Sequence, residues 1–196
     1  MTTLEKRIDG LNFAIEKSLR YHHRRRAHFD RLHRVAMLGV ILSGSAAFAT
    51  VFGRPEIFGA IAAVLGALDL VFAFSHRARD HDMLYRRFSD LAIELRQTAN
   101  PKENQFRRWV RSRLEIEKDE PPTYWAVEAS CYNEVTRAWE REASGLNEIG
   151  ILANFLMHWS KFERANFKAE PPSSNQKLRS EATTASSTPN EPQASG

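Results

Sequence analysis

The sequence predicts an all-α membrane protein, in which a two-helix transmembrane hairpin continues into long helical extensions and a small cytosolic helical bundle. Three observations lead to this fold class: two adjacent apolar runs, arginines on the outer flanks of both runs, and apolar side chains spaced three and four residues apart elsewhere. We divide the chain into a cytosolic basic helix (1–34), the hairpin (35–75), a cytosolic helical region (76–168) and a disordered tail (169–196).

The two apolar runs are Val35–Phe52 and Ile57–Ser75. The first holds 18 residues without an ionisable side chain, and the second holds 19 with Asp69 alone. As helices they are roughly 27–29 Å long, which matches the hydrocarbon core of a bilayer. A helical pair inside a soluble bundle is the alternative, but such helices are not apolar on every face. The Gly53-Arg54-Pro55-Glu56 joint has the turn formers and charges of a loop at the membrane surface.

Arginines orient the hairpin. By the positive-inside rule we expect a multi-pass protein of the inner membrane with both termini in the cytoplasm. With a net charge of +4, these cations fit anionic lipid headgroups better than nucleic acid, so we expect no direct nucleic-acid partner. The juxtamembrane arginines are Arg24, Arg25, Arg26, Arg31, Arg34, Arg77 and Arg79.

Helical spacing continues outside the two runs. One stripe precedes the first run and a second follows the other, so the two arms should pack as a coiled-coil-like stalk. Further helices are expected over residues 103–118, 124–143 and 146–167, the first of them with Phe106, Val110 and Leu114 on one face. The two stripes are Leu4, Ile8, Leu11, Ile15 and Leu19, then His81, Leu84, Phe88, Leu91 and Leu95.

Few residues indicate catalysis. The chain has no Gly-rich phosphate loop, paired-cysteine zinc motif or nucleophile elbow, so we expect no enzyme, catalytic residue, cofactor or metal site. Cys131, the single cysteine, lies on an apolar stripe and is expected to be buried. If the hairpin pairs Phe52 with Ile57, His33 lies beside His76 and His28 beside His81. Stacked imidazoles there would sense pH or bind a metal, although histidines at headgroup depth need no such role.

Asp69 is the one carboxylate within a predicted span. A charge there costs about 2.5–3.5 kcal/mol on insertion scales, so it should face protein or water. Two interpretations stay open: Asp69 lines an aqueous path between subunits, or it forms a hydrogen bond across the hairpin to Ser43 or another small polar residue.

Small residues follow both spans and favour close approach of helices in lipid. One set packs the hairpin or joins subunits: Gly39, Ser43 and Ala47 on the first span, with Gly59, Ala63 and Ala67 on the second. A further stripe, Ala62 and Gly66 with Asp69, is the candidate intersubunit face. Since two helices cannot enclose a pore, any channel must be a homo-oligomer.

Several segments occur together and in a fixed order along the chain: Tyr21 to Phe29, the hairpin, Tyr85 and Phe88, then Glu120, Pro121, Pro122, Tyr124, Tyr132, Asn133 and Glu134. This arrangement resembles the SLATT domain, a two-transmembrane effector of bacterial conflict systems. The resemblance covers about residues 5–143 and implies a membrane effector that is silent until a signal of infection reaches it. It also implies a partner system with a nucleotidyltransferase, a SLOG-type sensor protein or a reverse transcriptase.

The leading functional hypothesis is therefore an oligomeric pore-forming or membrane-disrupting effector of anti-phage defence, gated through its cytosolic helices. The alternative is a non-conducting, membrane-anchored adaptor that recruits a cytosolic partner. A membrane-bound enzyme using Glu128, Glu134 and His158 is the least favoured interpretation, because their helical spacing disperses them. The corner from Glu120 to Tyr124 and the Tyr132-Asn133-Glu134 segment are expected to form the structural core of the cytosolic region.

Overall fold

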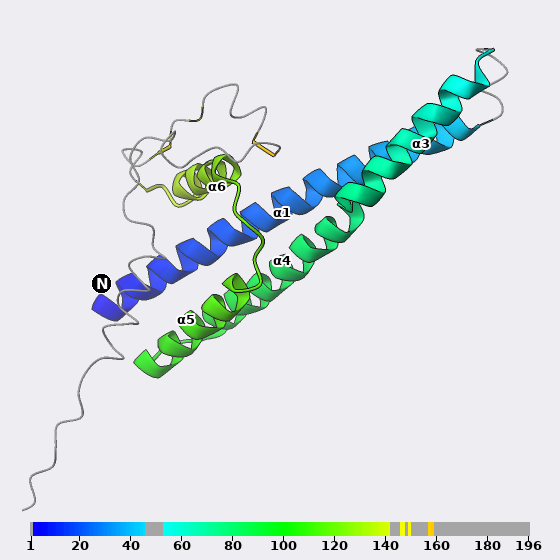
Figure 1. The fold of residues 1–196 in the computed structure, drawn as a ribbon. Helices are drawn as coiled ribbons and strands as arrows, with labels where there is room; N and C mark the ends of the chain where they lie inside the picture. Colours follow the sequence, from blue (N-terminus) through cyan, green and yellow to red (C-terminus); the bar gives the residue numbers. More distant parts are fainter. Residues whose placement is uncertain (1, 46–52, 142–145, 148, 150–156, 159–196) are drawn as a thin grey trace, which may run out of the picture.

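The computed structural model describes residues 2–45, 53–141, 146–147, 149 and 157–158. All regular secondary structure in these residues is α-helical, as predicted. The helices are α1 (Thr3–Gly44), α3 (Pro55–Phe72), α4 (Phe74–Gln97), α5 (Glu103–Glu117) and α6 (Trp125–Ala138). Figure 1 shows α1 antiparallel to α3 and α4 along one long rod, with α5 and α6 beside the end of the rod that holds the N-terminus.

The rod has two parts, which differ in their exposed side chains. We call residues 35–45 and 53–72 the apolar arm, and residues 3–34 and 74–141 the base. Helix α1 belongs to both parts, and the α3–α4 junction marks the border on the other side of the rod. The predicted helix over residues 146–167 and the predicted disordered tail over 169–196 lie almost wholly outside the described residues.

Helix α1 runs for 42 residues without a break. Its first turn is closed by a capping box, because Thr2 Oγ1 accepts a hydrogen bond from Glu5 N at 3.2 Å and Glu5 Oε2 accepts one from Thr2 N at 2.8 Å. The helix ends at Gly44, and Ser45 is extended. The expected continuation from the basic segment into the first apolar run is thus observed up to Gly44, and residues 46–52 of that run lie outside the described residues.

Helices α3 and α4 follow each other with one backbone break at Ala73. This residue has φ 48° and ψ 48°, a left-handed conformation that costs a non-glycine residue roughly 1–2 kcal/mol. Ala73 N still donates to Asp69 O at 2.8 Å, and Arg77 N donates to Ala73 O at 3.0 Å, so hydrogen bonding continues through the break. The stretch Glu56–Gln97 is long and apolar enough to cross a membrane.

The apolar arm exposes large hydrophobic side chains around the rod. Leu70 and Val71 of α3 are 81% and 74% exposed, and only 6% of the most apolar window of Glu56–Gln97 is buried. In the described part of the base, the large hydrophobic residues exposed to a comparable degree are Met83 and Ile93. The arm members are Val35, Leu38, Ile41, Leu42, Ile57, Ile61, Val64, Leu68, Leu70, Val71 and Phe72.

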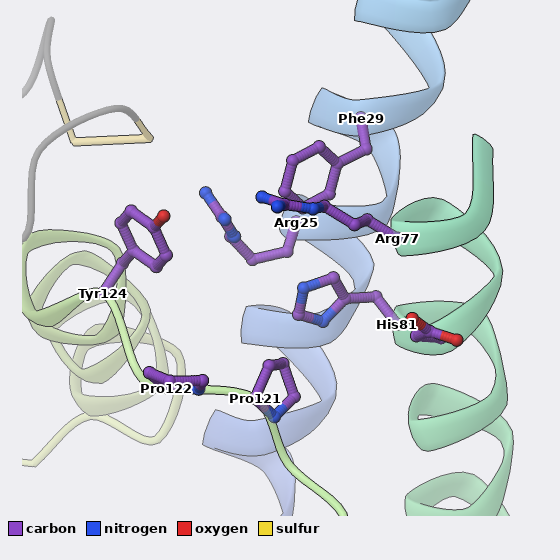
Figure 2. A pocket seen from close by; sticks show the side chains of 8 residues that line it. Arg25, Phe29, Arg77, His81, Pro121, Pro122 and Tyr124 are labelled. Atoms are coloured by element: carbon purple, nitrogen blue, oxygen red, sulfur yellow. The ribbon is translucent and has the colours of Figure 1, made fainter. Parts of the chain in front are cut away.

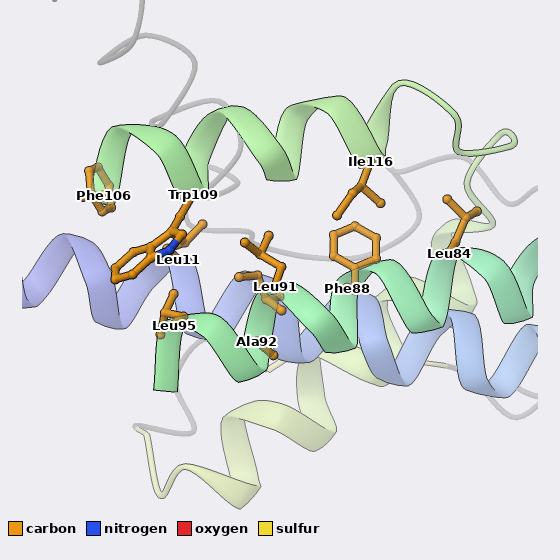
Figure 3. Close-up of a cluster of buried hydrophobic side chains, with 10 residues drawn as sticks. Leu11, Leu84, Phe88, Leu91, Ala92, Leu95, Phe106, Trp109 and Ile116 are labelled. Carbon is orange, nitrogen blue, oxygen red and sulfur yellow. The ribbon is translucent and has the colours of Figure 1, made fainter. Parts of the chain in front are cut away.

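The base has a conventional hydrophobic core. Figure 3 shows α5 packed on α1 and α4 through a cluster centred on Trp109 and Phe88, both of which are fully buried. Burying each such side chain contributes about 1.5–3 kcal/mol. The Trp109 indole also donates to Glu94 Oε1 at 3.1 Å. The other buried members are Leu11, Ile15, Leu84, Leu91, Ala92, Leu95, Phe106 and Ile116.

The buried face of α5 differs from the predicted one. Phe106 is buried as expected, but Trp109 and Ile116 fill the core, while Val110 and Leu114 are only partly buried. The helix is rotated because the large Trp109 ring removes more apolar area from water than Val110 can. Arg113, on the same buried face, is accommodated by an ion pair with Glu117 at 2.7 Å.

The pairing of α1 with the returning helices also differs from the prediction. His22, rather than His28, lies against His81, and His33 contacts Asp69 rather than His76. A move from His28 to His22 is six residues, or about 9 Å along the helix. The prediction placed the turn directly after Phe52, whereas α1 already ends at Gly44, so α3 and α4 return beside an earlier part of α1.

Candidate functional site

A polar pair lies at the border of the apolar arm and the base. His33 Nδ1 of α1 is 2.9 Å from Asp69 Oδ1 of α3, and 17% of the Asp69 side chain is exposed. Asp69 thus contacts His33 of α1, whereas one interpretation of the sequence had Ser43 or another small polar residue as its partner. This contact joins α1 to α3 near the start of the apolar arm.

Small residues in the arm have two different environments. A Cβ atom on Gly39 would lie 2.5 Å from Leu65 Cδ1, so this glycine allows α1 and α3 to approach closely. A Cβ on Gly66 would meet no atom within 4 Å. Ser43, Ala62 and Gly66 are half-buried, Gly59, Ala63 and Ala67 are exposed, and Ala47 lies outside the described residues.

The Glu120–Tyr124 corner joins α6 to the centre of the rod. Tyr124 N donates to the Tyr21 hydroxyl at 3.1 Å, and Glu120 Oε1 lies 3.1 Å from His22 Nε2. Residues about one hundred positions apart in sequence thus meet at one place, where the corner contacts the basic segment of α1. Tyr21 is buried, which raises the pKa of its hydroxyl to about 12, so it remains a neutral hydrogen-bonding group.

His22 and His81 form the centre of this contact. Their Nδ1 atoms are 3.0 Å apart, so one of the two must carry a proton and the other must accept. His22 stacks on Phe88 and His81 stacks on Phe29. Burial, followed by the charges of His22, Arg25 and Arg77, lowers the pKa of His81 to about 3. A neutral His81 that donates to His22, which in turn donates to Glu120, satisfies all of these atoms.

A pocket of about 350 Å³ opens beside His81. Figure 2 shows Arg77 reaching from α4 toward Phe29, while Arg25 extends from α1 toward Tyr124. The Arg25 guanidinium lies 3.9 Å from the Tyr124 ring centroid and 4.6 Å from that of Phe29, within cation–π range. The pocket is lined by Arg25, Phe29, Arg77, Asp80, His81, Pro121, Pro122 and Tyr124.

Arg25 is the cation that the fold buries most deeply in this pocket, with 2% of its surface exposed. Its Nη1 donates to the carbonyl oxygen of His158 at 3.0 Å. Burial, with a smaller contribution from the positive charge of Arg77, lowers its pKa, although a guanidinium remains charged at physiological pH.

The Tyr132-Asn133-Glu134 segment holds α6 in place. Asn133 forms two hydrogen bonds with the backbone of Asn147, both of 2.8 Å. Glu134 pairs with Arg24, and the Tyr132 ring contacts Phe13 of α1 edge-on at 5.5 Å. These contacts tie α6 to α1, and they tie the chain at Asn147 to α6.

The juxtamembrane arginines divide into two groups. Arg24, Arg25 and Arg26 have partners within the protein: Glu134 and Ser130 for Arg24, aromatic rings for Arg25, and Asp82 at 2.5 Å for Arg26. The others are exposed at the border of arm and base, although Arg34 also pairs with Asp30 at 2.7 Å and Arg79 donates to Ser75 Oγ at 3.2 Å. This exposed group comprises Arg31, Arg34, Arg77 and Arg79.

The described residues do not assemble a catalytic constellation. Glu128 pairs with Lys17 at 2.5 Å, Glu134 pairs with Arg24, and the His158 ring stacks on His28. No group of three or more metal-ligating side chains occurs in the described part of the chain. Burial raises the pKa of the Cys131 thiol to about 12, which keeps it protonated and unreactive.

Sequence reasoning found the corner, the basic segment and Asp69, but it missed their partners. Phe29 was noted only for the family resemblance, and His81 only for an apolar stripe and for a predicted contact with His28. Arg77 is the residue that could have indicated the pocket. It is the first arginine after the second apolar run, so in a hairpin it faces the arginine-rich segment that precedes the first run.

No protein-family model, no curated protein and no solved structure matches this chain. The likeness to SLATT domains therefore rests on the residues quoted for it. The structure brings several of these together around one pocket: Phe29, Arg25, Pro121, Pro122 and Tyr124.

Proposed function

We propose that this protein is a two-span effector of the inner membrane, which oligomerises through its apolar arm to form a pore or disrupt the bilayer. Its base would lie in the cytoplasm with both termini, and would control assembly. The observation that carries the proposal is the exposed surface of the arm. Soluble monomers rarely expose contiguous apolar patches of more than a few hundred Å², whereas lipid-facing helices must do so.

The second run supports a span directly, since α3 is about 27 Å long as an 18-residue helix. The other span would be the first apolar run, whose described part, residues 35–45, contains the end of α1. The polar His33–Asp69 pair fits this arrangement, because each group satisfies the other inside the protein rather than in lipid.

Continuity between arm and base supports control from the cytoplasm. Helix α1 connects the buried contacts of Arg25 and Phe29 to the arm without a break, whereas the other side of the rod has the left-handed residue Ala73 at the border. A change at the pocket would be transmitted along a stiff α1 and absorbed as a change of angle between α3 and α4. The α3–α4 angles before and after this change would define two states of the protein, and an activating signal would shift their populations.

Assembly is required because two helices cannot enclose a water-filled path. Gly59, Ala63 and Ala67 recur every fourth residue on α3 and are exposed, so they offer a surface on which a second subunit can approach closely. The resemblance to SLATT domains adds the biological setting, a bacterial conflict or anti-phage system in which membrane damage arrests the infected cell.

Dye release from liposomes tests the proposal. The purified full-length protein is reconstituted at rising protein-to-lipid ratios, and release is recorded for the parent, Ala63→Leu and Val64→Leu. The parent should release dye with a steep dependence on protein, since several subunits must meet. Ala63→Leu should need at least about tenfold more protein, because a large side chain blocks close helix approach.

Val64→Leu is the matched control, since it adds bulk at the neighbouring position, which is 58% exposed and already large. It should behave as the parent does. Release that rises linearly with protein, or that is equally reduced by both substitutions, would contradict an assembled pore. No release at any ratio would favour the non-conducting adaptor.

A further inference from the structure

We propose that the pocket between Arg25, Arg77 and Tyr124 binds a phosphate group, carried either by a phospholipid headgroup or by a small soluble compound. The proposal concerns binding alone, so it stands whether or not the protein forms a pore.

The pocket has an excess of positive charge. Arg25 and Arg77 both line it, and within the described residues neither forms an ion pair with a carboxylate. A buried cation is normally paired, because removing it from water is costly without a counter-charge. The aromatic faces of Phe29 and Tyr124 compensate for part of this cost, but they provide no negative ion.

Arg25 retains hydrogen-bonding capacity at this place. Its Nε atom is buried and has no hydrogen-bond partner among the described residues, while Nη1 is occupied by His158. Arg77 approaches from the opposite helix and is exposed at the rim, where its fork of donors is available to a ligand. Two guanidinium groups on facing helices form a clamp for the oxygen atoms of phosphate, which arginine often binds through two parallel hydrogen bonds.

One carboxylate also lines the pocket. The Asp80 Oδ2 atom lies 3.0 Å from His76 Nδ1, one turn earlier on α4. This contact partly compensates the negative charge of Asp80. With His81 neutral, the pocket still carries two positive charges against one negative charge. This balance favours an anion and does not favour a metal cation.

Size and position restrict the ligand. A volume of about 350 Å³ is near the lower end for small-molecule sites, which span roughly 300–1,000 Å³, so it holds a phosphate and a small attached group. Pro121, Pro122 and Tyr124 give this attached group an apolar wall. Arg77 is five residues beyond the end of α3, about 7 Å along the helix, so a headgroup phosphate and a cytosolic one are both within reach.

Thermal shift measurements on the full-length protein in uncharged detergent test the site. In one arm, sodium phosphate is titrated against sodium chloride at matched ionic strength. In the other arm, dioleoyl phosphatidic acid is titrated against dioleoylglycerol, which has the same acyl chains but no phosphate. Saturable stabilisation by phosphate, by phosphatidic acid or by both supports the proposal and identifies the source of the group.

The variants are Arg25→Gln, Arg77→Gln and Arg79→Gln. Arg77→Gln should weaken binding by about tenfold or more, because a hydrogen-bonded charge is lost. Arg77 is exposed, so this variant tests the site even if Arg25→Gln fails to fold. Arg79→Gln changes another exposed arginine, two residues further on, which does not line the pocket, and it should leave the affinity unchanged.

Two results would overturn the proposal. One is stabilisation that does not differ between each phosphate compound and its control. The other is an equal loss of affinity in Arg77→Gln and Arg79→Gln, which would mean that general positive charge, rather than the pocket, attracts the anion.

Discussion

The apolar arm and the base differ in which side chains they bury and which they expose. In the base, Trp109 and Phe88 are buried while arginines and carboxylates cover the surface in pairs such as Arg96–Glu16, at 2.9 Å. In the arm, leucine and valine side chains are exposed, and the ionisable pair His33–Asp69 lies between the helices at its border with the base.

Helix α1 makes the comparison direct, since one uninterrupted helix crosses both regions. Leu11 and Ile15 are fully buried at one end, and Val35 and Ile41 are more than 60% exposed at the other. The rules of helix geometry are the same throughout. What changes is the solvent to which each end is adapted, namely water around the base and, in our proposal, lipid around the arm.

Removing a core side chain of the base should have the largest effect. Trp109→Ala should destabilise the base by about 3–5 kcal/mol, because a cavity replaces a large buried ring. Ile93→Ala, at a position that is 49% exposed, should cost less than about 1 kcal/mol. Melting followed by circular dichroism in detergent measures both effects. Equal losses in the two variants would mean that the base has no such core.

Introducing a charge should distinguish the surface of the arm from that of the base. Val64→Arg should reduce membrane insertion at a cost of about 2.5–3.5 kcal/mol, because the guanidinium would face hydrocarbon. Met83→Arg is the matched control, with an apolar side chain of similar exposure, 52% against 58%, but in the base. The fraction of protein that resists carbonate extraction from membranes is the readout. Equal behaviour of the two variants would contradict the assignment of lipid to the arm alone.

Acid should weaken the base through its buried histidines. His81 has its pKa lowered to about 3, whereas an unfolded histidine titrates near 6.5. Below pH 6.5 the unfolded state takes up a proton that the folded state does not, so the stability present above pH 6.5 is lost progressively as the pH falls toward 3.

Between pH 7 and pH 5 we expect a loss on the order of 1–2 kcal/mol from His81. His28 and His158, whose pKa values are lowered by burial to about 4 and about 3, act in the same direction. The melting temperature at the two pH values measures the effect, and His81→Gln should reduce the difference. A protein that is more stable at pH 5 than at pH 7 would contradict the buried neutral histidines.

The smallest expected effect concerns the two kinds of ionisable pair. A double-mutant cycle on Arg96 and Glu16, both at the surface of the base, should give about 0.2–1 kcal/mol at low salt and almost nothing in 1 M NaCl. A cycle on His33 and Asp69, at the border of the arm, should give about 0.6–1.7 kcal/mol, and salt should change it little. Equal salt sensitivity of the two coupling energies would mean that water reaches both pairs alike.

The apolar runs and the helix types could be predicted from the sequence, because both depend on local composition and spacing. The predicted helix over 103–118 corresponds to α5, Glu103–Glu117, and the predicted helix over 124–143 contains α6, Trp125–Ala138. Hydrophobic periodicity carries this information within a few residues.

Pairing across the rod could not be predicted in the same way. Periodicity does not say where α1 stops, and an early end at Gly44 moves every contact of the returning helices by about 9 Å, from His28 to His22. The left-handed Ala73 gives no signal either, because alanine is a good helix former. The pocket depends on both of these features, which explains why its residues were recognised singly but not as one site.

The central claim, two membrane spans with the base in the cytoplasm, is tested most directly by single-cysteine labelling in intact cells. In a Cys131→Ser background, Lys6→Cys, Arg54→Cys and Met83→Cys each place one thiol at an exposed position. A membrane-impermeant maleimide should label only Arg54→Cys, and should label all three after the inner membrane is permeabilised. Labelling of Lys6→Cys together with Arg54→Cys in intact cells would mean that α3 alone crosses the membrane, and it would contradict the account.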